Sequence, residues 1–181
     1  VGADTVNTGT GTDTLELSTT STDFNNATDG QLQNVETIRL TAGGVTLNLG
    51  NQTETFVSII GSSGNDTITA TNQADTITGN IGNDTINAGG GDDTINNFLG
   101  VNTVDGGTGS DTLVLTGGSF LALNSATDTQ LTSVELINAT GASGTLNLAD
   151  QTEGFTINGS AVNAMTITGS AGADTITTGS N

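Results

Sequence analysis

Aliphatic residues recur at a nine-residue interval through the middle of the chain. Residues 61–114 divide without a gap into six units of nine residues, each with threonine at position seven and an aliphatic residue at position eight. The last three residues of a unit thus alternate polar, apolar, polar, which predicts a very short strand with one inward side chain. The first six residues are rich in Gly, Asn and Asp, which tolerate left-handed backbone angles in turns.

Short strands and turns of constant length predict a parallel solenoid. Two nine-residue units make one coil of 18 residues, and successive coils stack at a strand spacing of about 4.8 Å. Parallel crossover connections are right-handed. We therefore expect an all-β protein, a right-handed parallel β-solenoid (β-roll or β-helix) built from nine-residue half-coils.

The rest of the chain repeats at a longer interval. Residues 27–59 resemble residues 126–158, at an offset of 99 residues. Their aliphatic residues keep nearly the nine-residue spacing, so we expect further rungs of the solenoid there, with these inward residues in the second copy: Ile137, Leu146, Ile157, Ile167 and Ile176. Residues 18–35 and 116–134 interrupt the period, and we expect two excursions that carry a short helix or a loop.

The two repeats divide the expected rod into three parts. Residues 1–60 form a first solenoid repeat unit, residues 61–114 the nonapeptide roll, and residues 115–181 a second repeat unit homologous to residues 17–83. Joining Asn181 back to Val1 gives a sequence much like residues 93–115. This seam suggests that the chain is one period of a longer array.

The charge of the chain favours cations as partners. Nineteen acidic residues stand against the single Arg39, for a net charge of −18, and the chain has no Lys, His, Cys or Tyr. No basic surface exists to neutralise phosphates, so nucleic acid is not an expected partner. No apolar run approaches the ~18 residues of a membrane span, so we expect no direct membrane insertion.

Three units carry a recognisable nonapeptide. GNIGNDTIN (79–87) and GGTGSDTLV (106–114) match the pattern G-G-x-G-x-D-x-U-x, and AGGGDDTIN (88–96) nearly does. On these residues the chain resembles the RTX (repeats-in-toxin) family, whose nonapeptides fold as a calcium-binding β-roll. The resemblance covers the roll, with single units at 8–16 and 169–177.

The resemblance implies Ca²⁺ bound between units two apart, by two carboxylates and backbone carbonyls of the turns. Position six holds the implied ligands, Asp66, Asp75, Asp84, Asp93 and Asp111, with turn carbonyls near Ser63, Ile81, Gly90 and Thr108. Outlying candidates are Asp4, Asp13, Asn102 and Asp174. The pairs Asp66/Asp84 and Asp93/Asp111 fit best, because their turns keep glycine at position four. The alternative is that the turns close by Asx hydrogen bonds without metal.

Catalysis has little support. Without His, Cys, Lys or Tyr, only carboxylate pairs could perform acid–base chemistry, so we expect no enzyme. Threonines at position seven form outward ladders, which suit an exposed strand and leave an ice-binding solenoid as a minor alternative.

We therefore expect an extracellular structural protein of a bacterial cell surface, in which calcium couples binding to folding. The chain looks like large bacterial S-layer and surface-filament proteins, so copies of itself are the expected partners in a lattice or filament, after type I secretion. The alternative is an RTX tail or adhesin extender of a type I-secreted toxin or enzyme.

Overall fold

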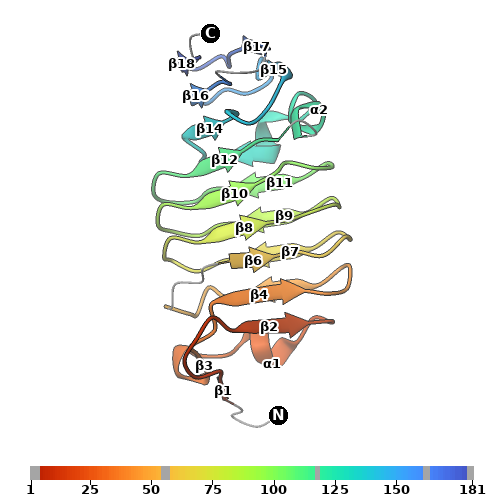
Figure 1. Cartoon of the computed structure of the whole chain (residues 1–181), viewed down its shortest axis with the longest axis vertical. Helices are drawn as coiled ribbons and strands as arrows, with labels where there is room; N and C mark the ends of the chain where they lie inside the picture. The colour runs from red at the N-terminus through yellow and green to blue at the C-terminus, as the bar shows by residue number, and fades with distance from the viewer. Residues whose placement is uncertain (1–4, 54–57, 117–118, 161–163, 179–181) are drawn as a thin grey trace.

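Short parallel strands stack along a rod in the computed structural model, which describes residues 5–53, 58–116, 119–160 and 164–178. The described chain runs from one end of the rod to the other (Figure 1). Every strand pair is parallel, and in the roll Thr76 lies opposite Thr94, 18 residues later. The predicted β-solenoid is thereby confirmed.

One face of the rod is a single nine-stranded sheet in the order β18-β16-β14-β12-β10-β8-β6-β4-β2. Because one strand of each coil joins this sheet, it runs across the expected boundaries at residues 60 and 114. Its strands are β2 (Thr14–Leu17), β4 (Thr37–Leu40), β6 (Ser58–Ile60), β8 (Thr76–Thr78), β10 (Thr94–Asn96), β12 (Thr112–Val114), β14 (Leu136–Asn138), β16 (Thr156–Asn158) and β18 (Thr175–Thr177).

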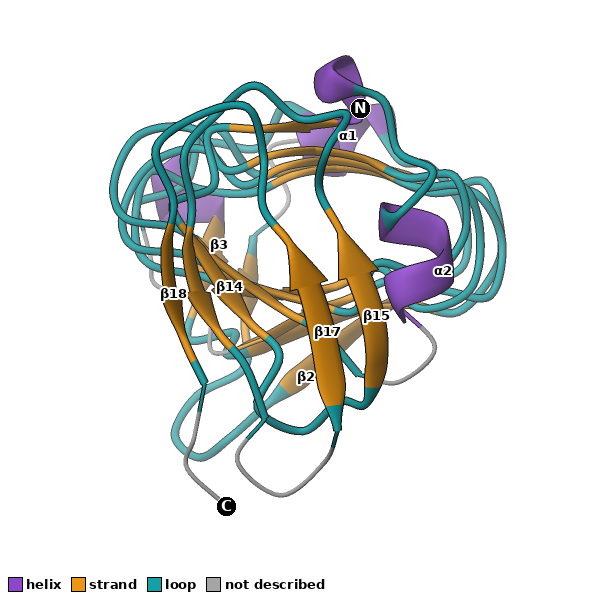
Figure 2. Ribbon diagram, turned by 90° about the horizontal axis from the view of Figure 1, so that it is seen from above, coloured by secondary structure: helices purple, strands orange, loops and turns teal. Residues whose placement is uncertain are grey.

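The opposite face is divided into three sheets. They comprise β1 (Val6–Asn7) with β3 (Leu32–Gln33); β5 (Thr46–Asn48), β7 (Thr67–Thr69), β9 (Thr85–Asn87), β11 (Thr103–Asp105) and β13 (Leu131–Thr132); and β15 (Gly144–Asn147) with β17 (Met165–Thr168). Seen along the rod, the two faces enclose the interior, and the helices lie at the periphery (Figure 2).

The interior is filled by one aliphatic side chain per strand. The position-eight residues of the roll are at most 1% exposed, and they are Ile68, Ile77, Ile86, Ile95, Val104 and Leu113. Burying one such side chain contributes roughly 1.5–3 kcal/mol. Of the rungs expected in the second repeat, Ile137, Leu146 and Ile157 are fully buried, whereas Ile176 is 46% exposed. Ile176 keeps its register opposite Ile157, but β18 has only one neighbouring strand.

Both expected excursions contain short helices, which divide the second face. The first holds α1 (Thr22–Asn25) and a 3-10 turn at Asp29–Gln31; the second holds α2 (Ser119–Leu123) and a 3-10 turn at Asp128–Gln130.

An asparagine at the C-terminal end of each helix forms hydrogen bonds with the backbone edge of a strand in the next coil. The Asn25 side chain donates to Thr46 O at 2.9 Å and accepts from Asn48 N at 3.0 Å. Asn124 makes the same pair of bonds with Thr145 O and Asn147 N, at 2.8 and 2.7 Å. Each side-chain amide replaces the peptide group of a missing strand, which satisfies the edge of β5 or β15.

Recurrent Gln-Thr pairs fasten each excursion to the coil above it. Gln52 Nε2 donates to Ala27 O at 2.7 Å, and Gln151 Nε2 donates to Ala126 O at 2.9 Å. The following threonines, Thr53 and Thr152, donate their backbone N–H to Asp29 and Asp128, each at 2.7 Å. These contacts explain why the Gln-Thr dipeptide recurs in both long repeats.

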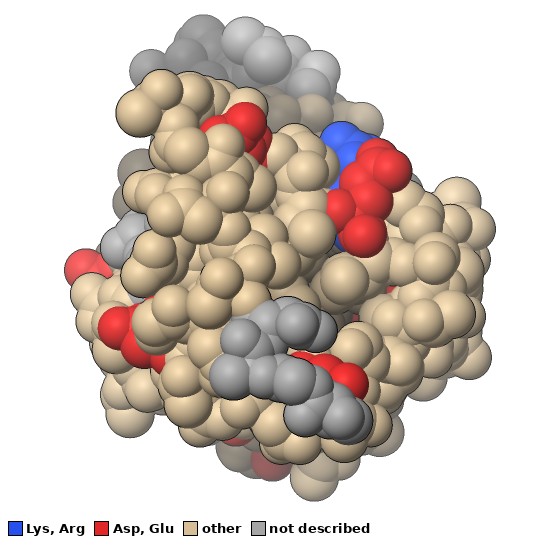
Figure 3. All heavy atoms as spheres, turned by 90° about the horizontal axis from the view of Figure 1, so that it is seen from below, with Lys and Arg blue, Asp and Glu red and all other residues tan. Residues whose placement is uncertain are grey.

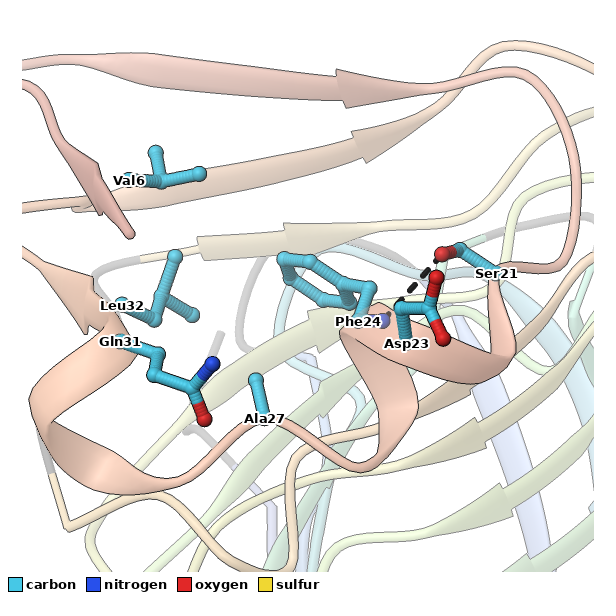
Figure 4. A pocket seen from close by; sticks show the side chains of 7 residues that line it. All are labelled: Val6, Ser21, Asp23, Phe24, Ala27, Gln31 and Leu32. Atoms are coloured by element: carbon cyan, nitrogen blue, oxygen red, sulfur yellow. Dashed lines mark hydrogen bonds between the residues drawn. The ribbon is translucent and has the colours of Figure 1, made fainter. Parts of the chain in front are cut away.

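Each excursion also leaves a pocket against the preceding coil. In the first, of about 240 Å³, Phe24 and Leu32 face the pocket with Val6 across from them, and Ser21 caps α1 (Figure 4). The second pocket, of about 380 Å³, is lined by residues that include Val101, Leu121, Ala126 and Gln130. The two long repeats thus fold alike, and each has a pocket beside its helix.

Candidate metal centre

Carboxylates at position six form ladders along the rod. Each lies directly before a strand and is at most 2% exposed across the roll. In Asp84, Asp93 and Asp111, Oδ1 accepts the backbone N–H of position six one coil earlier. Asp84 accepts from Asp66 at 2.9 Å, Asp93 from Asp75 at 2.7 Å, and Asp111 from Asp93 at 2.8 Å. The structure therefore pairs residues two units apart, as the nonapeptide frame predicts.

In one class of turn, the second carboxylate oxygen is held by a hydroxyl residue at position two. Ser62 donates both its N–H and its Oγ–H to Asp66 Oδ2, each at 2.7 Å. Thr71 does the same for Asp75 Oδ2, at 2.9 and 2.8 Å. The Asp174 turn is built alike, with Ser170 N donating to Oδ2 at 2.8 Å. These turns close by hydrogen bonds within the protein, which is the alternative that the sequence left open.

In the other class, the second carboxylate oxygen is buried and lacks a hydrogen-bond partner. This holds for Oδ2 of Asp84, Asp93 and Asp111. Position two of these turns has no hydroxyl and adopts a left-handed conformation, with φ of 67° at Asn80, 96° at Gly89 and 95° at Gly107. A buried carboxylate oxygen without a partner is costly. A bound cation would remove that cost, so the residues present fit a metal.

Two outlying candidates extend this comparison. Asp13 Oδ2 is also buried without a hydrogen-bond partner, and Gly9 has a φ of 96°, as in the second class. Asn102 continues the ladder of hydrogen bonds, because its side-chain oxygen accepts from Asp84 N at 2.8 Å. Its side chain is a neutral amide, whereas the aspartates carry a negative charge when ionised. Asp4 lies outside the described residues.

The glycines of these turns permit close stacking of the coils. A Cβ on Gly107 would stand 2.1 Å from Gly89 O, and one on Gly109 would stand 2.0 Å from Gly91 O. Backbone bonds also link the turns, because Thr108 N donates to Gly89 O at 3.0 Å and Gly91 N donates to Thr108 O at 2.9 Å. Among the expected carbonyl ligands, Thr108 O therefore already accepts one hydrogen bond and retains one lone pair for a metal.

Burial raises the pKa of the same three carboxyls. It raises the pKa of Asp84 to about 6, with Asp66 as a neighbouring charge, and the pKa of Asp93 to about 7, with Asp111 and Asp75 as neighbouring charges. The pKa of Asp111 is raised by burial and by Glu135. In each case hydrogen bonding to a backbone N–H opposes the shift. Without a cation, burial therefore favours the neutral form of these carboxyls, so that Asp93 is about half protonated at pH 7 while Asp84 is mostly ionised there.

A pH dependence follows for the calcium-free chain. The folded pKa values of Asp84 and Asp93 lie above the ordinary aspartate value of 3.8. Between about pH 4 and 7 the folded state therefore holds more protons than the unfolded state. Stability without calcium should therefore fall as pH rises through this range. We expect the strand signal of circular dichroism in chelator, which is small at pH 7, to be larger at pH 5. A larger signal at pH 7 would contradict the assignment of the shifts.

The ladders contain two residues that the sequence argument missed. Glu36 Oε2 accepts from Asp13 N at 2.9 Å, and Glu135 Oε2 accepts from Asp111 N at 2.8 Å. Each glutamate stands directly before a strand, β4 or β14, where the roll has aspartate. The signal in the sequence is the recurrence of Val-Glu in both long repeats, with the glutamate two residues before Ile38 or Ile137.

The acidic side chains of the described residues form ladders and not compact clusters. Among the described residues, no group of three or more His, Cys, Asp or Glu side chains could hold a metal, so a site here depends on two carboxylates completed by carbonyls or water. On the surface, the one cationic side chain lies beside acidic atoms, with other acidic groups scattered (Figure 3); Glu16 is the residue opposite Arg39 in register. None of the helices in the described segments has the length and apolar character needed to cross a membrane.

Comparison with known families bears on these turns directly. A model of the RTX calcium-binding nonapeptide repeat, in four copies, matches residues 1–16, 60–95, 98–119 and 166–181. The matched segments contain all the aspartates of both classes. No curated protein and no solved structure matches the chain significantly.

Proposed function

The chain belongs to the RTX family of calcium-binding repeat proteins, and on that basis we propose that it is an extracellular structural protein that folds on calcium and assembles into a cell-surface layer or filament. RTX nonapeptides bind Ca²⁺ and typically occur in secreted proteins. The observation that carries the proposal is the set of buried carboxylate oxygens without partners, on Asp84, Asp93 and Asp111.

These three aspartates, together with Asp13, are the residues that would hold calcium. Calcium takes six to eight oxygen ligands and accepts carboxylates, carbonyls and water. The bound ion supplies positive charge between carboxylates that otherwise repel one another. Asp66, Asp75 and Asp174, whose Oδ2 atoms accept hydrogen bonds from Ser62, Thr71 and Ser170, keep the other turns closed.

Calcium thereby controls folding. The chain has a net charge of −18, so self-repulsion favours its expanded state. A ligand that binds only the folded state adds about 2.7 kcal/mol per site when present at 100 times its dissociation constant. Low calcium inside a cell would leave the chain open for export, and millimolar calcium outside would close the coils.

A calcium titration followed by far-UV circular dichroism tests this step. We expect little strand signal in chelator and a cooperative gain as calcium rises into the millimolar range. Magnesium at equal ionic strength is the control, because its rigid octahedral coordination suits these turns poorly. A full strand signal that chelator does not change would refute calcium-dependent folding.

Assembly is supported by the rod itself. Within the described residues, β2 and β18 end the nine-stranded sheet with one neighbour each, and such strand edges pair readily with another chain. Negative-stain electron microscopy with and without calcium distinguishes the outcomes. Filaments or sheets that form only in calcium support assembly; dispersed rods would refute it and favour the alternative, a calcium-stiffened tail or extender of a larger secreted protein.

An exposed threonine ladder supports ice binding as a minor alternative. Thr46, Thr67, Thr85 and Thr103 lie in register on neighbouring strands and are all exposed. Thermal hysteresis of the purified chain would support this function, and its absence at high protein concentration would exclude it.

A further inference from the structure

The last turn of the roll meets a coil of different sequence. Asp111 is 0% exposed; its Oδ1 accepts from Asp93 N at 2.8 Å, while its Oδ2 is buried without a hydrogen-bond partner. The next position-six residue is Glu135, whose Oε2 accepts the Asp111 N–H at 2.8 Å. The nonapeptide pattern ends at residue 114, but the ladder of carboxylates continues for one more coil.

Oxygens from two coils converge beside this turn. A Cβ on Gly106 would stand 2.8 Å from Asp111 Oδ2 and 1.9 Å from Ser133 O. The carboxylate oxygen and the carbonyl oxygen therefore border the same small space, which only glycine leaves open. Ser133 adopts a left-handed φ of 55° and stands two residues before Glu135 in the same turn.

A similar arrangement occurs one long repeat earlier, except that Thr8 stands at the position of Gly106 and donates its hydroxyl to Asn34 O. Asp13 Oδ2 is buried without a partner, and Asp13 N donates to Glu36 Oε2 at 2.9 Å. Asn34, the counterpart of Ser133, has a φ of 57°. The glycines also correspond, with φ of 96° and 138° at Gly9 and Gly11 against 95° and 138° at Gly107 and Gly109. The pairing of aspartate and glutamate thus accompanies each excursion, whereas the space bordered by a turn carbonyl accompanies the second.

We propose that Asp111 and Glu135, with the Ser133 carbonyl, form a terminal calcium site outside the nonapeptide pattern, and that Asp13 and Glu36 form a related site without the carbonyl. The inference rests on the proposed calcium binding and adds a glutamate ligand from the coil after each excursion. Calcium accepts carboxylates in one- or two-oxygen modes and tolerates water as a ligand. Because Glu135 is exposed, solvent reaches the site, which closes the end of the roll and fastens it to the next coil.

Glu135→Gln tests the site with little change to the fold, since its amide oxygen can still accept the Asp111 N–H. The readout is calcium bound per chain, by equilibrium dialysis of the whole chain in millimolar calcium. We expect E135Q to bind one ion fewer than the parent chain and the E36Q/E135Q double variant two fewer. Asp150→Asn, on an exposed turn residue, removes the same charge and should bind as many ions as the parent.

The outcomes separate the two proposals. A parent chain that binds no calcium would overturn the proposed function and this inference with it. A parent that binds calcium, with an unchanged count in E135Q, would overturn the terminal site alone. If E135Q does not fold, Glu36→Gln alone decides, because the coil it affects adjoins the first strands and leaves the roll intact; an unchanged count in E36Q overturns the site.

Discussion

Replacing Gly107 by alanine is expected to lower the free energy of unfolding by about 4 kcal/mol in calcium, combining backbone strain with a steric clash. The new Cβ would stand 2.1 Å from Gly89 O, and neither backbone can retreat without breaking the hydrogen bonds between coils. Denaturant unfolding followed by circular dichroism measures the loss.

Gly9 supplies a matched control for this change. Its φ of 96° equals that of Gly107 within a degree, but a Cβ there would meet nothing within 4 Å. Alanine at this position therefore pays only the cost of the left-handed conformation, about 1–2 kcal/mol. Equal losses at the two glycines would show that backbone strain, and not the stacking of turns, sets the requirement for glycine.

Replacing Asp93 by asparagine is expected to have opposite effects with and without calcium. In calcium, the variant loses a charged ligand, and its melting temperature should fall by roughly 5–10 °C. Without calcium, the change removes a buried carboxylate whose pKa is raised by burial and by the Asp111 and Asp75 charges, so the folded fraction at pH 7 should rise. Asn102 shows that an asparagine keeps the ladder, since it accepts from Asp84 N at 2.8 Å.

Asp66 supplies a control for the predicted opposite effects of D93N on stability with and without calcium. Both of its oxygens already accept hydrogen bonds, from Val45 N and from Ser62. Asp66→Asn should therefore destabilise the chain by about 1–2 kcal/mol in calcium and should not raise the folded fraction without calcium. A D93N variant that is destabilised equally with and without calcium would show that Asp93 acts through hydrogen bonds alone. Thermal unfolding of both variants in calcium, together with their strand signal in chelator, decides between these results.

The strands of the roll could be predicted residue by residue. Each position-seven threonine begins a strand and each position-eight residue is buried, because period-two alternation next to a Gly-Asn-Asp turn leaves one possible register. The excursions were predicted to carry a short helix or a loop, but the bounds of the helices were not, since four- or five-residue helices have weak intrinsic signals. Their asparagine contacts with β5 and β15 depend on which strand lies beside the helix, and the sequence does not contain that information directly.

The two classes of turn differ at the residue in position two of the nonapeptide. Asp66 and Asp84 look alike in the sequence, and both turns have glycine at position four. Position two separates them: the Ser62 hydroxyl occupies Asp66 Oδ2, whereas Asn80 leaves Asp84 Oδ2 without a partner. Hydroxyl residues at position two could have been read as a signal for turns that need no metal. The glutamate at the end of the roll was hidden because the excursion displaces it from the nine-residue frame.

The stacking of coils determines how the rod would give way under tension. Hydrogen bonds between coils lie along the rod axis, while the chain winds around it, so a pull on the termini would peel one coil at a time. Each 18-residue coil of the roll would release about 60 Å of chain, and the 24-residue coil from Thr112 to Leu136 would release about 80 Å. Every calcium ion that bridges two coils would raise the force needed to separate them. The protein would then extend in steps under load and dissipate energy at each step, and the calcium concentration around it would set the force at which each step occurs.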